Sequence, residues 1–418
     1  MSNIKQVYAT LKIDDGQIQL LLAEYYNTRF NIINTYVNKV DGVSGYRVID
    51  EEKLVDCIKE AVEVVSKKVG AKLEKIILIL PPYNFKRTSL RASVIPSDGH
   101  IKKKDIARAI TNALKTKVDD QLMVINATIV KYTINGISSR RLPENESCDE
   151  LLVDIDLLCA DKEMAYSYVN AVYKANLEVL DLCLNNFAIA KESVALENSV
   201  SQNIILLDIE NSCTYLSLLS KGKLLSSEII YDGLSGLSTM VYNQYHLPAS
   251  NIPRLLKYNV NFNSQYKDDA IYAWSENNVS KSITVGELSD FVKPVLTTYV
   301  EKLMQTCKPI IDKGASFLVC GEGSEMSALI SLIKNESNCE IKTYYPDAIG
   351  VRNTSLCACY GTLFVYKEKA ILNDLSVNCV NIAEYDKTVD QINVDVEGES
   401  ITTKIKNLFE MYKDREDI

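Results

Sequence analysis

The stretch DIENSCTYLSL, residues 208–218, decides how this chain folds. Its surroundings, IILLDIENSCTYLSLLSKGKLL (204–225), predict a buried strand, a tight turn and a return strand. The chain opens on a similar unit, TLKIDDGQIQLLL (10–22), in which Asp residues again occupy the turn. An Asp at the end of such a strand often precedes a glycine loop that binds phosphate. Here the turn reads Glu210, Asn211, Ser212 instead, so its capacity to bind phosphate is in question.

The composition is that of a large globular protein. The chain has 418 residues, enough for two or more cores, and 47% of them are hydrophobic. The net charge of −9, from 46 basic and 55 acidic residues, disfavours general nucleic-acid binding. Eleven cysteines without a CxxC pair, and an N-terminus without a signal peptide, indicate a cytosolic protein with reduced thiols. Only His100 and His246 are present, which disfavours a histidine triad or multi-histidine metal site.

The first 83 residues predict a strand meander, a helix and a further strand. A helix is expected over 51–69, because apolar residues recur there at helical spacing, and Gly70 is placed to cap it. A buried strand then ends at Pro81 and Pro82. The three strands of the meander are expected in VYATLKI (7–13), IQLLLAEYY (18–26) and FNIINTYVN (30–38).

A different unit is expected over residues 84–165. Its helix presents Ile106, Ile110 and Leu114 on one face, and strands follow in INATIVKYTING and LLVDIDLLCAD. Asp154 and Asp156 alternate on the last strand and are expected to face solvent. After a helix, a strand and a second helix, the second half repeats the strand meander that opened the first.

This duplication is the plan of the actin/hexokinase ATPase fold, in which two hairpins hold phosphates from opposite sides of a cleft. The chain resembles the FtsA family, the actin-like bacterial cell-division proteins, over nearly its whole length. Besides the hairpins and the insert, the resemblance rests on VNAVYKANLEVLDLCLNNFAIAKESVAL, FLVCGEGSEMSAL and YYPDAIGVRNTSLCACYGTLFVY. The last segment is the most specific, through Pro346, Ile349, Gly350, Arg352 and Gly361.

The resemblance implies an α/β fold of two duplicated RNase H-like domains with an inserted SHS2-like subdomain, called 1C. It divides the chain into 1–83 and 166–200 (1A), 84–165 (1C), 201–234 and 313–345 (2A), 235–312 (2B), 346–370 (a closing helix of 1A), 371–399 (an acidic linker) and 400–418 (an amphipathic helix).

The resemblance also implies a nucleotide site, whose residues have changed here. The metal-organising Asp of the family's first loop, Gly-Leu-Asp-Ile-Gly-Thr-Thr, falls on Lys12, and the loop Gly falls on Asp14. In the second loop, Asp-Ile-Gly-Gly-Gly-Thr-Thr-Asp, Glu210 puts a carboxylate where phosphate would lie. Two like unit charges about 4 Å apart repel by about 4 kcal/mol near a protein surface. The remnant site is expected at Lys12, Gly16, Asp208, Thr214, Gly233, Gly321, Gly323, Ser324 and Gly350.

These changes leave no cofactor firmly predicted. Direct contact between Lys12 and phosphate keeps weak ATP binding open, whereas Mg²⁺, which prefers carboxylate and water oxygens, is not expected. The adenosine loop keeps Gly321, Gly323 and Ser324, and it is read either as a remnant pocket or as a structural turn. No nucleophile, acid/base pair or metal cluster emerges elsewhere, so the expected protein is not an enzyme.

The partners follow from the resemblance. The family binds the C-terminal peptide of FtsZ on subdomain 2B, where Lys293, Arg254 and Lys257 are the candidate contacts, and it self-associates through 1C. It also ends in a membrane-targeting helix, and SITTKIKNLFEMYKDREDI (400–418) fits one. Such a helix binds the surface of anionic lipid without spanning it. Its apolar face would consist of Ile401, Ile405, Leu408, Phe409 and Tyr412, with Lys404 and Lys406 beside it.

The predicted function is therefore an FtsA-like adaptor on the inner face of the cell membrane at the division site. It would tether FtsZ and help to recruit other division proteins. Two alternatives stay open. A pilus-assembly protein like PilM shares the fold and the insert but lacks the C-terminal tail. A sugar or acetate kinase shares the superfamily, but the loss of both glycine loops argues against it.

Overall fold

The computed structural model describes residues 5–263, 265–276, 279–351 and 353–397. Its first half is built on a five-stranded sheet in the order β11-β6-β1-β2-β3. β1, β2 and β3 form the expected antiparallel meander, and β6 and β11 add to it in parallel. The strands are β1 (Gln6–Asp14), β2 (Gln17–Tyr26), β3 (Arg29–Lys39), β6 (Lys75–Leu80) and β11 (Glu178–Leu184), with a short ribbon of β4 (Val43–Ser44) and β5 (Arg47–Val48).

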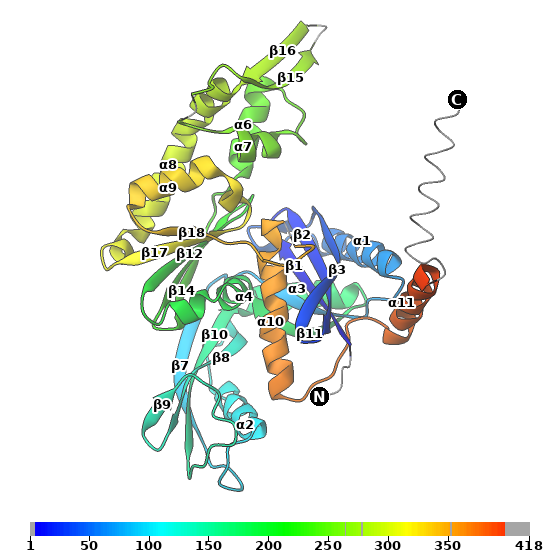
Figure 1. Ribbon diagram of the computed structural model, residues 1–418, viewed down its shortest axis with the longest axis vertical. Coiled ribbons are helices and arrows are strands. Elements are labelled where there is room, and N and C mark those ends of the chain that lie inside the picture. Colours follow the sequence, from blue (N-terminus) through cyan, green and yellow to red (C-terminus); the bar gives the residue numbers. More distant parts are fainter. Residues whose placement is uncertain (1–4, 264, 277–278, 352, 398–418) are drawn as a thin grey trace.

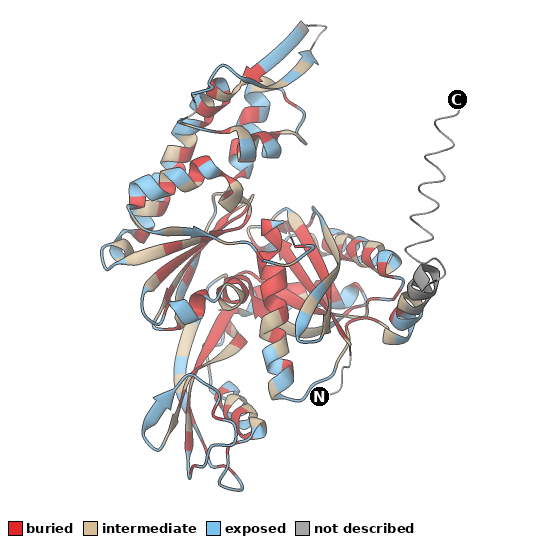
Figure 2. Cartoon of the chain, in the orientation of Figure 1, coloured by how far each residue is buried: buried red, intermediate tan, exposed pale blue. Residues whose placement is uncertain are grey.

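Helices α1 (Glu51–Val69) and α3 (Lys162–Lys174) pack on each other beside this sheet (Figure 1). Asp50 caps the start of α1 by accepting a hydrogen bond from the Lys53 amide, and Gly70 ends the helix in the left-handed region, as the sequence predicts. Leu54, Ile58 and Ala61 of α1 are buried in the core. The central strands of this half are almost wholly buried (Figure 2).

The second half repeats the plan of the first. Its sheet has the order β14-β13-β12-β17-β18, in which an antiparallel meander is again extended by two parallel strands. The duplication seen in the sequence is therefore a duplication of topology. The strands are β12 (Asn203–Ile209), β13 (Thr214–Ser220), β14 (Lys223–Ile230), β17 (Ala315–Cys320) and β18 (Ile341–Thr343), followed after β17 by η1 (Glu322–Glu325) and α9 (Ser327–Ser337).

Residues 86–161 form a separate four-stranded sheet in the order β7-β10-β8-β9, with a hydrophobic cluster of its own. Asp156 does not face solvent as the alternation predicted. It is buried and pairs with Arg87 of the same sheet (3.2 Å) and with Lys223 of β14 (3.4 Å). The insert thus contacts the second half through a buried carboxylate. Its elements are β7 (Lys86–Val94), α2 (Lys103–Leu114), β8 (Leu122–Ile134), β9 (Ile137–Ser139) and β10 (Leu151–Asp161).

The region between β14 and β17 forms the end of the molecule furthest from the insert (Figure 1). Its long helix starts at a capping box made by Thr284 and Glu287, and Val292, Leu296 and Val300 lie buried along it. Its elements are α6 (Ser235–Tyr245), α7 (Ile252–Asn259), the hairpin of β15 (Ala270–Glu276) and β16 (Val279–Thr284), and α8 (Val285–Ile311).

Two helices pack between the halves. α4 (Asn185–Glu192) contacts β12, and α10 (Cys357–Leu372), which follows η2 (Thr354–Leu356), contacts β1 and β6. The two helices also pack closely on each other: a Cβ atom on Gly361 of α10 would lie 2.3 Å from the carbonyl oxygen of Ala188. Gly361, which lies in the segment most specific to the FtsA resemblance, therefore permits this close approach. The short α5 (Ala195–Asn198) leads from α4 to the second half.

The predicted acidic linker over 371–399 is wrong for its described part. After α10 the chain docks on the first half and forms α11 (Ile382–Glu397) beside the end of α1 (Figure 1). Cys379, Val380 and Tyr385 are buried, the Cys379 amide donates to the Val7 carbonyl, and Glu384 accepts from the Lys72 amide. Asp374, Glu384 and Asp386 are exposed, so net charge alone did not reveal a docked segment.

Candidate nucleotide cleft

The ends of β1 and β12 meet between the two halves, where the resemblance implies the nucleotide cleft, and buried charged groups fill the space between them. The Lys12 ammonium lies 2.7 Å from an Asp14 oxygen and 3.0 Å from a Glu210 oxygen, with 2%, 6% and 4% of these side chains exposed. The Tyr215 hydroxyl donates to Asp14 (2.7 Å), and Asp208 accepts from the side-chain amide of Asn185 on α4 (2.9 Å). We call Lys12, Asp14, Asp208, Glu210 and Tyr215 the cleft cluster.

The electrostatics of the cleft cluster keep the amine charged. Burial alone would favour neutral Lys12, but Asp14, Glu210 and Asp208 outweigh it and hold the pKa of the amine well above its usual value. Burial raises the pKa of Glu210 far above its usual value and raises that of Asp208 too, against the opposing attraction of Lys12. Three carboxylates thus face one ammonium, and at Glu210 and Asp208 burial opposes ionisation while the nearby Lys12 charge favours it.

The Glu210 amide and the Asn211 carbonyl of the turn after β12 already have backbone partners. The Glu210 amide donates to the Cys213 carbonyl (2.9 Å), and the Ser235 amide donates to the Asn211 carbonyl (2.7 Å). The Asn211 side chain donates to Glu322 (2.9 Å). A phosphate loop instead points free N–H groups at its ligand. The turn therefore closes on itself and on the neighbouring η1.

The glycine turn after β17 packs tightly against β12. Gly321 has φ +73°, and a Cβ there would lie 2.6 Å from an Asp208 oxygen, so this position requires glycine. Gly323 packs on the Ile209 side chain, and the Ser324 hydroxyl donates to the Gly321 carbonyl. These contacts account for the preserved glycines as structural residues of the β17–η1 turn.

Acidic side chains of η1 form ion pairs and hydrogen bonds with the neighbouring elements. Lys257 of α7 lies 3.7 Å from Glu322 and 3.5 Å from Glu325, with 17% of its side chain exposed. Glu325 also accepts from Thr354 (2.7 Å) and Tyr258 (3.0 Å), and although burial opposes ionisation, these donors and Lys257 lower its pKa. Lys257, predicted as a partner contact, is thus engaged inside the cleft.

The other predicted nucleotide residues lie around this cluster without joining it. Gly16 lies in the β1–β2 turn, Gly233 lies against the Glu210 carbonyl, and Gly350 lies against the Ile32 side chain. Thr214 is buried and hydrogen-bonds to the Asp232 carbonyl and Tyr299.

The comparisons with known proteins agree with this architecture. No protein-family model matches the chain. It is similar to a chain of a PilM–PilN type IV pilus biogenesis complex, with a TM-score of 0.55 and 13% identity over 86% of this chain and 98% of that one. It is also similar to MreB5 of Spiroplasma citri bound to ADP, with a TM-score of 0.50 and 10% identity over 88% and 98% of the two chains. The chain has an actin-like ATPase fold.

In sequence, this actin-like protein is similar to curated cell division proteins FtsA. That of Enterococcus faecalis (strain ATCC 700802 / V583) is 19% identical over 437 aligned positions, covering 96% of this chain and 98% of the relative. That of Bacillus subtilis (strain 168) is 19% identical over 358 positions, covering 84% and 81%. The similarity thus extends over both halves and the insert.

The residues of this actin-like cleft do not fit a magnesium nucleotide. Glu210 and Asp14 would face the phosphates, and the Lys12 amine that could neutralise them is already paired with both. The Glu210 amide, one of the N–H groups that a glycine loop would present to phosphate, already donates to the Cys213 carbonyl. Within the described residues, no group of three or more His, Cys, Asp or Glu side chains is arranged to hold a metal ion.

The predicted partner residues Arg254 and Lys293 are exposed on the second half. Arg254 lies on α7, and Lys293 lies on α8 with its amine 5.7 Å from the centre of the Phe262 ring.

The membrane-facing residues predicted at 401–412 lie outside the described residues. Within the described part of the chain, no helix has both the length and the apolar character needed to cross a bilayer.

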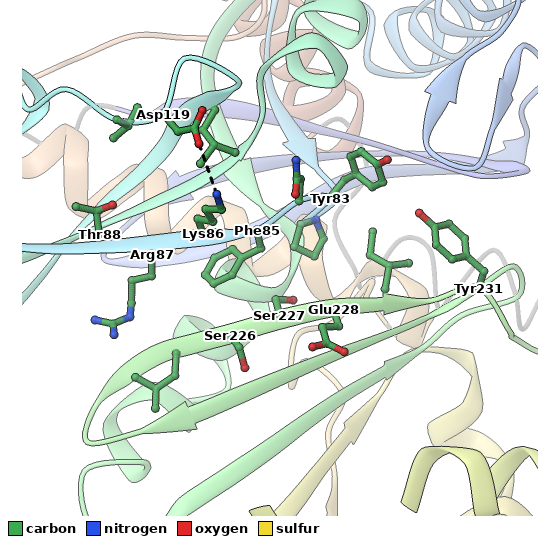
Figure 3. Close-up of a pocket in the computed structure, with 16 residues that line it drawn as sticks. Tyr83, Phe85, Lys86, Arg87, Thr88, Asp119, Ser226, Ser227, Glu228 and Tyr231 are labelled. Atoms are coloured by element: carbon green, nitrogen blue, oxygen red, sulfur yellow. Dashed lines mark ion pairs between the residues drawn. The ribbon is translucent and has the colours of Figure 1, made fainter. Parts of the chain in front are cut away.

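A groove lies between two sheet edges (Figure 3). Its volume is about 700 Å³, and its walls come from β7, an edge strand of the insert, and β14, an edge strand of the second half. Lys86 and Asp119 form an ion pair there (3.6 Å), with Arg87 and Glu228 nearby on opposite walls. None of the cleft cluster residues lines this groove.

Glu192, at the end of α4, predicts a pH effect on stability. Burial raises its pKa to about 7, and its Oε2 atom is buried without a hydrogen-bond partner in the described residues. The unfolded chain releases this proton near pH ~4.3. The free energy of unfolding therefore falls as pH rises from ~4.3 to about 7, and the full loss remains above pH 7.

We expect Glu192→Gln to raise the free energy of unfolding at pH 8 by about 1–3 kcal/mol and to leave it nearly unchanged at pH 4. Urea denaturation across this pH range measures the difference. Glu197→Gln, at an exposed position, is the matched control. A parallel pH profile for Glu192→Gln and the unaltered protein would contradict the assignment.

Proposed function

We propose that this protein is a cell-division adaptor similar to FtsA. It would tether FtsZ to the inner face of the membrane and would not act as an enzyme. The observation that carries the proposal is its similarity to FtsA over 96% of this chain and 98% of the relative. Similarity of this extent covers the insert and both halves, which a shared nucleotide-binding core alone would not require.

The adaptor is proposed to work without a nucleotide cycle, because the cleft cluster occupies the phosphate region. A ligand at one hundred times its dissociation constant would raise the free energy of unfolding by about 2.7 kcal/mol. We expect no measurable rise when the protein is unfolded by urea with 1 mM or with 10 mM Mg-ATP. We also expect phosphate release no faster than from a boiled sample. Sustained turnover that is lost in Asp208→Ala would contradict this prediction.

The FtsZ contact is proposed on α7 and α8 of subdomain 2B, where Arg254 and Lys293 are exposed. Lys257 contributes to this contact only if its ion pairs with Glu322 and Glu325 open. Self-association is proposed through the insert. Its separate sheet and its own hydrophobic cluster are consistent with a distinct interaction module.

The experiment that tests the adaptor role is a titration with the labelled C-terminal peptide of FtsZ from the same organism. We expect saturable binding that weakens at least tenfold in Arg254→Glu/Lys293→Glu. Lys53→Glu/Lys68→Glu, which reverses two exposed charges on α1, is expected to bind as the unaltered protein does. No binding by the unaltered protein, or equal loss in both variants, would contradict the proposed contact.

A pilus-assembly role is the second candidate. It is favoured by the TM-score of 0.55 to a chain of the PilM–PilN complex, 98% of which is covered. At 13% identity this similarity supports the fold alone. Failure of the FtsZ peptide to bind, together with binding of a peptide from a pilus-assembly protein, would favour this candidate.

A further inference from the structure

Four of the cleft cluster residues connect the two halves of the molecule directly. Lys12 and Asp14 belong to β1 in the first half, whereas Glu210 and Tyr215 belong to the β12–β13 hairpin in the second. Two close polar contacts cross between them: Lys12 to Glu210 at 3.0 Å and Tyr215 to Asp14 at 2.7 Å. All four side chains are buried. The halves are thus joined here by a buried ion pair and a buried hydrogen bond, in addition to the packing of α4 and α10.

The Lys12 ammonium has a central position in this contact. It lies between one carboxylate from each half, at 2.7 Å from Asp14 and 3.0 Å from Glu210, and 5.9 Å from the centre of the Tyr215 ring. A cation held between anionic groups on both walls draws the walls together, and the attraction strengthens in a buried site of low dielectric. In ligand-dependent hinge proteins, a bound ligand provides this contact between the domains.

We propose that Lys12 is a built-in bridge that replaces a bound ligand and holds the two halves in one closed arrangement. Because the bridge is part of the chain, closure does not depend on nucleotide concentration or hydrolysis. The surfaces of both halves then keep a fixed relative position in every molecule. This inference stands independently of the proposed role in cell division, because it concerns only contacts within the chain.

The test is hydrogen–deuterium exchange of the full-length protein, combined with small-angle X-ray scattering. In Lys12→Met/Glu210→Gln the bridge is removed while the sum of charges in the cleft is unchanged. We expect amides of residues 208–216 to exchange at least tenfold faster and the radius of gyration to rise. Amides of β6, within the first-half sheet, should be unaffected. Lys67→Met/Glu63→Gln removes an exposed pair on α1 and should change neither measurement.

Tyr215→Phe provides a second test in case the double variant does not fold. It deletes only the hydroxyl that reaches Asp14 across the cleft. We expect exchange at residues 208–216 to rise at least threefold, with the secondary structure unchanged by circular dichroism. Exchange and scattering indistinguishable from those of the unaltered protein, in whichever variant folds, would overturn the proposal.

Discussion

Replacing Lys12 by methionine is expected to lower the free energy of unfolding at pH 7 by about 3–5 kcal/mol, the usual cost of breaking a buried ion pair. Methionine fills much the same volume, so the loss arises from charge rather than from a cavity. Without the ammonium, Asp14 and Glu210 lose the cation that lies at 2.7 Å and 3.0 Å, and both remain buried. Since native domains are stable by only about 5–15 kcal/mol, this is a large fraction of the total.

Urea denaturation followed by tryptophan fluorescence and circular dichroism measures this loss. Lys12→Met/Glu210→Gln should be less destabilised than Lys12→Met alone, because one of the unpaired carboxylates is then neutral. Lys67→Met, which breaks an exposed pair with Glu63 at 2.6 Å, is the matched control and should cost less than about 1 kcal/mol. If Lys12→Met cost no more than this control, the cleft cluster would not be the ion-pair network described above.

Truncation after Glu399 is expected to abolish sedimentation of the protein with vesicles that contain phosphatidylglycerol. The proposed interfacial helix at 400–418 would insert its apolar residues among the lipid chains. Full burial of a side chain such as Leu408 or Phe409 contributes about 1.5–3 kcal/mol, and partial burial contributes less. Removing all five apolar residues should therefore reduce the bound fraction to that of a sample without vesicles.

Phe409→Glu tests the same proposal with one substitution and should reduce vesicle binding at least tenfold. Binding of the full-length protein should weaken as salt rises, because screening reduces the attraction between Lys404, Lys406 and anionic lipid. Asn407→Glu adds a similar charge away from the apolar face and should have the smaller effect. Equal sedimentation of the truncated and full-length proteins would show that the membrane contact lies elsewhere.

The elements of both meanders were predictable from the sequence, because their signals are local. Strand and helix periodicities appear within a few residues, and Gly70 marks the end of α1 by its left-handed conformation. The change at the phosphate loops was equally visible, since Lys12 and Glu210 replace residue types that the chemistry of a nucleotide site requires. The sequence predicts that Glu210 repels phosphate and leaves direct contact between Lys12 and phosphate open.

The bridge itself was not predictable in this way, because its partners are far apart in the chain. Lys12 and Glu210 are 198 residues apart, and only the packing of the two sheets brings them within hydrogen-bonding distance. Tyr215 and Asn185 were missed altogether. Each looks like an ordinary strand or helix residue until the neighbouring carboxylate is known. The pairing of Asp156 with Lys223 was missed for the same reason.

Residues 371–399 show most clearly the difference between what the sequence predicts and what the tertiary structure decides. Their charges predicted an acidic linker, since a segment rich in acidic residues buries little by itself. The described part nevertheless docks, because Cys379, Val380 and Tyr385 find a complementary surface beside α1 and β1. The sequence by itself determined the elements, their duplication and the loss of the phosphate loops, which depend on residue type and local spacing. The tertiary structure alone decided which distant charges pair and which apolar residues are covered, because both depend on the surface that the rest of the chain presents.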